Sequence, residues 1–315
     1  MGRYALQRFL LVIPTLLGMT LLIFILVRLL PGDVVTSMSA GEITSDANHQ
    51  RIRQALGLND PLPLQYVHYL GGLLTGDLGS SFLSGQPVAL ILARAIPITV
   101  ELALLAAAFA IVVGVPLGVI SAVKPNSRLD AVARVGGLIG LSLPNFWVAT
   151  LGLLITSVIF HWIPAVTWIP FLSDPPGNLA QIALPAFALS LATLAIVMRM
   201  TRASLLEVLN EDFVRTARAK GIAPGPVVFG HALRNALIPV VTVIGAQVGG
   251  LMGGSVIIEV IFGLPGVGYS LVQAIYNRDY PIVQVAAVYL AAVFVLVNLG
   301  VDLLYGVIDP RIKQN

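Results

Sequence analysis

The chain has 315 residues, of which 57% are hydrophobic and only 10% charged, and its formal net charge is +3. Soluble domains carry about 25% charged residues, so this chain has too little polar surface to coat a water-soluble globule and belongs in a lipid bilayer. It has no cysteine and four histidines. This excludes disulfides and thiolate chemistry, and no two histidines stand at a ligand-like spacing, so we expect no metal site.

Six apolar segments are long enough to cross a membrane as helices, since a span needs about 20 mostly apolar residues with every backbone group paired inside it. They are residues 9–30, 97–123, 135–160, 180–200, 236–260 and 283–307. The sequence therefore predicts an all-α polytopic membrane protein with six transmembrane helices. The first segment is longer than the core of a signal peptide, which has about 7–15 residues, so we expect residues 1–30 to stay in the membrane.

The lysines and arginines predict the orientation of these spans. With the N-terminus inside, 13 of the 18 basic residues lie on the cytoplasmic side and five outside. We therefore expect both termini to be cytoplasmic, with residues 308–315 as a tail. Residues 31–95 are expected to form an extracytoplasmic cap, with a short helix, a break at Asn59-Asp60-Pro61 and a second amphipathic helix.

Polar residues inside the spans are functional hypotheses by default, because a charge in lipid is costly. Glu259 stands near the external end of the fifth span, where a role in an external gate and a structural hydrogen bond are equally favoured. Asp302 and Asn298 lie one turn apart in the sixth span; packing is the favoured role for Asp302, and Asn298 is a hypothetical pathway residue. Pro144 and Asn145 interrupt the third span, either to line a pathway or as a plain kink.

Glycines recur at four-residue spacing in the fifth span, at Gly245, Gly249 and Gly253. Small residues at this spacing allow close helix packing. The contact could be within the chain or with a second membrane subunit.

Residues 201–236 form a long connection between the fourth and fifth spans, and its basic segment "EDFVRTARAKG" stands out in an apolar chain. Asn210 or Asp212 is expected to cap a short helix there, and Gly221 is expected to end it in the left-handed conformation. Pro224 and Pro226 then separate it from a second helix over 227–238. Three acidic neighbours and the lack of an aromatic platform disfavour nucleic-acid binding. Lipid headgroups would explain the charges alone, but a capped, rigid helix favours docking into the groove of a partner.

Here the sequence resembles a known family. Ala217, Gly221 and Leu233 fit the spacing of the EAA loop of ABC-importer permeases, although Arg215-Thr216 replace its Glu-Ala, His231 its Ile and Arg234 its Pro. "RTARAKG" with "HALRNALIPV" is similar to the subgroup that imports di- and oligopeptides, nickel chelates, glutathione and some sugars. "ALGLNDPLPLQYVHYL", "LPNFWVATL", "GGSVIIEVIFGLPGVG", "NRDYPIVQ" and "VDLLYGVIDPRI" extend the resemblance along the chain.

This resemblance implies a type I ABC importer permease fold in a prokaryotic inner membrane, with a five-helix core over 96–307 preceded by an extra N-terminal helix. The basic helix would be the coupling helix that docks on a cytoplasmic ATPase. The implied docking residues are Asp212, Phe213, Arg215, Thr216, Ala217, Arg218, Lys220 and Gly221. The implied partners are a second, homologous permease subunit, two ATPase subunits that bind ATP and Mg, and an external solute-binding protein.

The chain itself has no motif for ATP hydrolysis or for acyl transfer. No Gly-Lys pair occurs, so a P-loop cannot be present, and no Gly-x-Ser-x-Gly elbow occurs either. We therefore expect a permease subunit without catalytic residues, and no cofactor bound by this chain. A stand-alone secondary transporter or channel is the alternative, which the helix–Gly221 module disfavours.

Overall fold

The computed structural model describes residues 2–29, 59–164 and 167–308. Within these ranges the chain is helical apart from short connections and one isolated antiparallel bridge between Ser80 and Pro87. The helices are α1 (Gly2–Leu29), α4 (Leu62–Thr75), α5 (Val88–Val123), α6 (Arg128–Ser142), α7 (Asn145–Phe160), α8 (Pro175–Val208), α9 (Asp212–Ala219), α10 (Pro224–Pro226), the π-helical turn η1 (Val227–Ala232), α11 (Leu233–Phe262), α12 (Val267–Tyr276) and α13 (Tyr280–Ile308).

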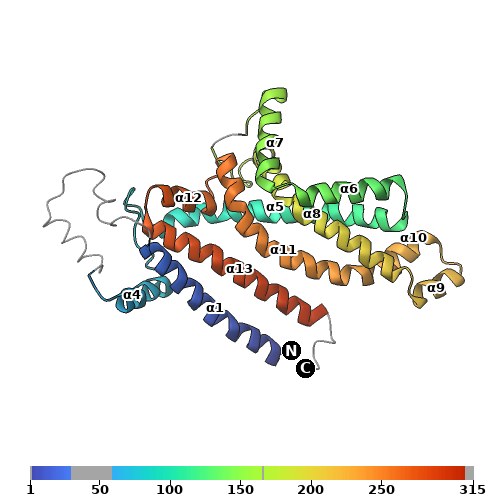
Figure 1. Ribbon diagram of the computed structural model, residues 1–315, viewed down its shortest axis with the longest axis horizontal. Helices are drawn as coiled ribbons and strands as arrows, with labels where there is room; N and C mark the ends of the chain where they lie inside the picture. Colours follow the sequence, from blue (N-terminus) through green and yellow to red (C-terminus); the bar gives the residue numbers. More distant parts are fainter. Residues whose placement is uncertain (1, 30–58, 165–166, 309–315) are drawn as a thin grey trace.

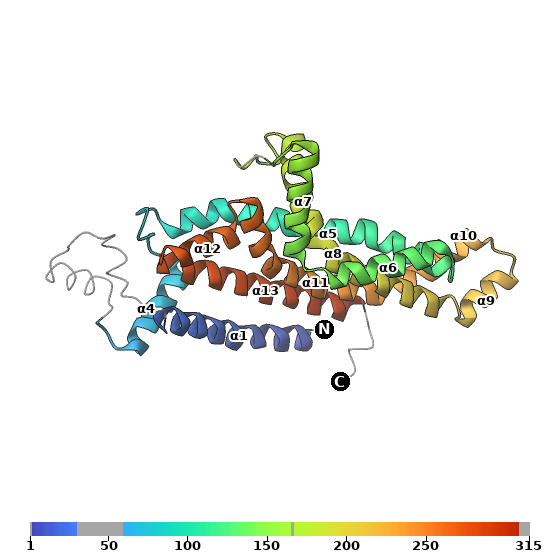
Figure 2. The same cartoon turned by 45° about the horizontal axis from the view of Figure 1, so that its top comes forward.

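Five helical segments of the described chain are long and apolar enough to cross a membrane, and a sixth is added if α6 and α7 count as one broken span. The five are Leu6–Leu29, Val88–Val123, Pro175–Val208, Pro224–Phe262 and Tyr280–Leu303. The all-helical, multi-span prediction is confirmed. Figures 1 and 2 show α9 and α10 at one end of the long axis and α4 and α12 at the other.

The third predicted span, 135–160, is not a single helix. α6 and α7 meet at an angle of 102°, and α7 stands out from the bundle in both views (Figures 1 and 2). The break falls at Leu143 and Pro144, which both have extended backbone conformations. Proline has no backbone N–H and disfavours a helical conformation in the residue before it, which explains the position of the bend.

The centre of the bundle is made by α5, α8 and α11, with Ala149 of α7 packed against them. α5 and α8 approach closely because α5 carries glycine at the contact. A Cβ on Gly118 would lie 2.6 Å from the carbonyl oxygen of Met198, and a Cβ on Gly114 2.9 Å from that of Leu194. The two backbones therefore pack closely at positions where a larger residue would force them apart.

A second cluster joins the start of α5 to α12, α13 and α1. α1 packs on α13, and Arg8 of α1 forms an ion pair with Asp302 of α13, with 3.0 Å between Nη1 and Oδ2. Asp302 thus connects two helices, as the packing interpretation expected. The start of α1 and the end of α13 consequently lie on the same side of the bundle, the side away from α4 (Figure 1).

The α4 end is tied together by buried polar contacts. Asp279, at the start of α13, accepts hydrogen bonds from Ser81 Oγ (2.5 Å) and from the backbone N of Phe82 (3.1 Å). α4 is the second amphipathic helix expected in the cap. The helix predicted before Asn59 lies outside the described residues.

Candidate functional site: a basic surface helix and the membrane interior

α9 is attached to the bundle by one narrow face. Val214 and Ala217, three residues apart, are buried in a cluster with Val119, Leu205 and Val227 from α5, α8 and η1. Residues three apart share a helix face, so the rest of α9 points away from the bundle. The exposed predicted residues are Asp212, Phe213, Arg215, Thr216, Arg218, Lys220 and Gly221. Of the predicted docking set, only Ala217 is buried, so it anchors the helix rather than presenting a side chain.

The start of α9 differs from the prediction. Glu211 occupies the N-cap position, and no side chain caps the helix. Asp212 is the first helical residue, and its exposed carboxylate lies 3.3 Å from Arg215 Nη1. The Asn210 side chain instead donates to the carbonyl oxygen of Leu206, 2.9 Å away. Asn210 therefore bonds back to the last turn of α8 rather than forward to the first turn of α9.

The end of α9 is as predicted. Gly221 has a φ of +78°, the left-handed conformation that glycine adopts without steric cost. The N–H of Gly221 donates to Arg218 O (2.9 Å) and that of Ile222 to Ala217 O (3.3 Å). This pair of bonds is a Schellman motif, which satisfies the last carbonyls of a helix. α9 is therefore a short helix with a defined end.

The chain returns to the membrane through the helix expected over 227–238, which continues directly into the fifth span. Helical structure runs from Pro224 to Phe262 as one 39-residue segment. A π-helical turn, Val227–Ala232, lies near its start. Val227, Val228 and Ala232 of that turn belong to the cluster that holds α9, so α9 packs on the first turns of the helix that becomes the fifth span.

A buried ionic network that the sequence did not predict lies beside this cluster. Asp130 is fully buried, and its carboxylate accepts from Arg202 at 2.8 Å (Nε to Oδ1) and 3.1 Å (Nη2 to Oδ2). Ser121 Oγ and the backbone N of Asn126 donate to the same carboxylate. The network joins α5, α6 and α8. A bidentate Arg–carboxylate pair with further donors is among the stronger polar contacts in proteins.

At the opposite end, Glu259 is fully buried. Its Oε1 accepts from Thr99 Oγ1 (2.8 Å) and its Oε2 from the backbone N of Tyr269 (3.0 Å). Thr99 Oγ1 in turn accepts from the backbone N of Val267 (2.8 Å). A Cβ on Gly266 would collide with the carboxylate. Of the two predicted roles, the structural hydrogen bond is present, and it holds α12 against α5 and α11.

The other predicted pathway residues do not gather around Glu259. Pro144 is exposed at the α6–α7 bend, and Asn145 Nδ2 lies 3.5 Å from Leu189 O of α8. Asn298 is half-buried on α13, next to Gly249. No hydrogen bond or ion pair between described residues joins any two of these four positions. Within the described ranges, no group of three or more His, Asp or Glu residues could hold a metal ion.

The fifth-span glycines divide between two environments. A Cβ on Gly245 would lie 2.7 Å from Val301, and one on Gly249 would lie 3.3 Å from Phe294, both on α13. A Cβ on Gly253 would meet nothing within 4 Å. Gly245 and Gly249 thus lie against α13, while Gly253 faces open space.

The described chain is thus a bundle of membrane-spanning helices with one short polar helix, α9, held at one end by a narrow anchor. Solved structures with this fold include the MetNI methionine ABC transporter in inward-facing conformations (TM-score 0.56, 20% identity, 71% of this chain and 98% of that chain). An amino acid ABC transporter solved with histidines is a second (TM-score 0.54, 15% identity, 69% and 93%). The chain therefore has the fold of a type I ABC importer permease.

Sequence comparison identifies the family. Residues 114–314 match the binding-protein-dependent transport system inner membrane component, and residues 1–103 match the N-terminal part of such components. The chain belongs to this family. It is 43% identical over 337 residues to the dipeptide transport system permease protein DppB of Escherichia coli K12, covering 100% of this chain and 99% of the relative. It is 40% identical over 335 residues to DppB of Alkalihalophilus pseudofirmus, covering 98% and 99%.

The chain is thus the pore-forming membrane subunit of an ABC importer in an inner membrane. The comparisons give no support to the alternative of a stand-alone secondary transporter or channel.

Proposed function

We propose that this permease carries di- or oligopeptides, and that α9 is its coupling helix. The peptide class rests on the near full-length similarity to dipeptide permeases. A nickel chelate, glutathione or a sugar would use the same architecture, because an external binding protein selects the solute.

The single observation that carries the coupling role is the way α9 is held. Two buried side chains, Val214 and Ala217, fix it to α5, α8 and η1, and its basic side chains point outward. Its first turn holds Asp212 and its last turn Arg218, an arrangement that suits the helix dipole. A rigid, exposed helix of this kind fits into a partner's groove, and a push on it would reach α11 through η1.

The remaining parts of the proposal follow from this role. α9, the start of α1 and the end of α13 would face the cytoplasm, as the distribution of basic residues favours. Two ATPase subunits would bind and hydrolyse ATP with Mg, a second homologous permease would complete the pore, and this chain would contribute no catalytic residue. Pro144, Asn145, Glu259 and Asn298 would take part in the pathway or its gate.

Site-directed crosslinking tests the coupling role. The chain has no cysteine, so Ala219→Cys on the exposed last turn of α9 introduces a unique thiol. The whole importer is co-expressed, a bifunctional thiol reagent is added to membranes, and the products are identified. We expect a crosslink to a P-loop ATPase subunit that changes in yield when ATP is added.

Leu74→Cys is the matched control, because Leu74 is 87% exposed on α4 at the opposite end. A crosslink to the ATPase from position 74 but not from position 219 would contradict both the coupling role and the orientation. Uptake of labelled dipeptide by cells that depend on this importer tests the solute class separately.

A further inference from the structure

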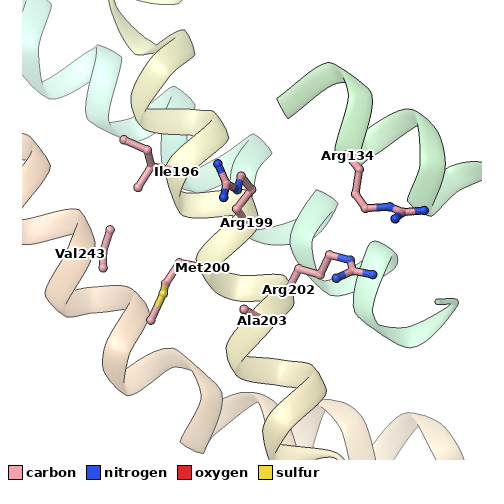
Figure 3. A pocket seen from close by; sticks show the side chains of 7 residues that line it. All are labelled: Arg134, Ile196, Arg199, Met200, Arg202, Ala203 and Val243. Carbon is pink, nitrogen blue, oxygen red and sulfur yellow. The ribbon is translucent and has the colours of Figure 1, made fainter. Parts of the chain in front are cut away.

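A cavity of about 560 Å³ opens between α6, α8 and α11, and its lining includes neither a residue of α9 nor Glu259. Figure 3 shows Arg199 and Arg202 on α8, with Arg134 on α6 across from them. The apolar part of the lining includes Ile196, Met200 and Val243. This volume lies in the range of small-molecule sites in proteins, about 300–1,000 Å³.

The cavity has more positive charge than its neighbours neutralise. The carboxylate beside it is Asp130, which is held by Arg202 at 2.8 Å and lies 3.5 Å from Arg134 Nε. Asp130 is already saturated with donors from Ser121 and Asn126. Arg199 is exposed, and among the described residues no carboxylate lies within ion-pair distance of it. Three guanidinium groups share one carboxylate, so the cavity keeps a net charge of about +2, which would attract an anion.

The position of the arginines along α8 suits the surface layer of a membrane. α8 has 34 residues, a length of about 51 Å at 1.5 Å per residue, whereas the hydrocarbon core is about 30 Å thick. The expected span of this helix, 180–200, ends at the level of Arg199. Arg199 and Arg202 therefore lie where the hydrocarbon gives way to headgroups, at the same end of α8 as α9.

We propose that this cavity binds the phosphate group of an anionic phospholipid, of the phosphatidylglycerol type. Arginine presents a planar fork of donors that matches phosphate, and basic pockets between membrane helices bind anionic lipid headgroups. Arg199, which has no carboxylate partner among the described residues, contacts the phosphate, Arg134 and Arg202 add positive charge beside it, and an acyl chain lies along Ile196, Met200 and Val243. The lipid thereby joins α6 to α8 and α11 next to the Asp130 network.

Lipid titration of the full-length chain, purified in a mild uncharged detergent, tests the site. Phosphatidylglycerol, phosphatidylcholine or inorganic phosphate is added, and the thermal unfolding midpoint is followed. We expect phosphatidylglycerol alone to raise the midpoint of the wild type, by about 3 °C at saturation. Arg199→Gln should weaken the apparent affinity for phosphatidylglycerol about tenfold, which is the loss of one charge-assisted contact.

Arg128→Gln is the matched control, because Arg128 is exposed on the first turn of the same α6 and does not line the cavity. It should titrate like the wild type. Since Arg199 has no carboxylate partner, Arg199→Gln should unfold at the wild-type midpoint when no lipid is added, which separates a lost site from a failure to fold.

Four results would overturn the proposal. Equal stabilisation by phosphatidylcholine would mean that the cavity does not distinguish an anionic headgroup from a zwitterionic one. An equal effect of inorganic phosphate would show an anion site without a lipid. An equal loss of phosphatidylglycerol affinity in Arg128→Gln would mean that the lipid is attracted by the positive surface in general and not by this cavity. In Ala203→Cys, protection of the thiol from a labelling reagent by a co-expressed second permease, and not by lipid, would show that the cavity is a contact between subunits.

Discussion

Glu259 and Asp212 are both carboxylates near a helix end, but their burial and hydrogen bonding are opposite. Glu259 is fully buried with both oxygens bonded to α5 and α12, whereas the Asp212 side chain is 95% exposed and contacts only Arg215. The same contrast holds for their surroundings. The backbone of α12 bonds to the Glu259 carboxylate inside the chain, while the polar side chains on the outer face of α9 are left to solvent or to a partner. The first carboxylate ties helices together, and the second remains accessible to the partner that we propose for α9.

The largest effect should come from Glu259→Ala. Removing the carboxylate leaves the Thr99 hydroxyl and the Tyr269 N–H without their buried acceptor, and we expect a loss of about 3 kcal/mol in the free energy of unfolding. Chemical unfolding of the detergent-solubilised chain, followed by tryptophan fluorescence, measures it. Glu207→Ala, at an exposed site on α8, should stay within about 0.5 kcal/mol of the wild type. Equal losses in the two variants would show that the network contributes nothing of its own.

Gly221→Val should act on the α9 end alone. At a φ of +78° a β-branched residue costs about 2 kcal/mol locally. We expect the end of α9 to fray and binding-protein-stimulated ATP hydrolysis by the assembled importer to fall about tenfold, with membrane insertion unchanged. Gly225→Val is the control, because Gly225 has no positive φ and open space at its Cβ position. Normal coupling in Gly221→Val would count against α9 as the transmitting element.

Arg215→Gln should have the smallest effect on stability, and it separates the role of α9 in folding from its proposed role in binding the ATPase. The exposed pair with Asp212 contributes at most about 0.5 kcal/mol to folding, so the unfolding midpoint should not move. Binding of the ATPase should weaken about fivefold at low salt, and the difference should shrink as salt screens the charge. Affinity measured at two ionic strengths checks this. Arg94→Gln, exposed near the start of α5, should leave ATPase binding unchanged, and a salt-independent loss in Arg215→Gln would contradict an electrostatic role.

The sequence could predict what depends on neighbours along the chain. The spans follow from runs of apolar residues, and the end of α9 follows from Gly221, because left-handed backbone is a local property. The contacts between distant residues carried no such signal. Asp130 and Arg202 are 72 residues apart, Thr99 and Glu259 160, and Ser81 and Asp279 198, and nothing in either partner's neighbourhood indicates the other.

The third span shows the intermediate case. Pro144 marks where the helix must break, since proline removes a backbone donor and restricts the preceding residue. The 102° angle at that break depends on how α6 and α7 each pack against α8, which no local pattern encodes.

The attachment of α1 has a consequence for how the protein is made. α1 packs mainly on α13, the last helix in the part of the chain that the structure describes. The ion pair between Arg8 and Asp302 can form only after α13 has been synthesised. At a synthesis rate of about 5–20 residues per second, between roughly 10 seconds and a minute pass after α1 emerges before α13 follows it. During that interval α1 must persist in lipid on its own hydrophobicity. Its exposed leucines and isoleucines, such as Leu10, Ile13 and Leu22, suit a helix that is inserted into lipid before the helix on which it packs has been made.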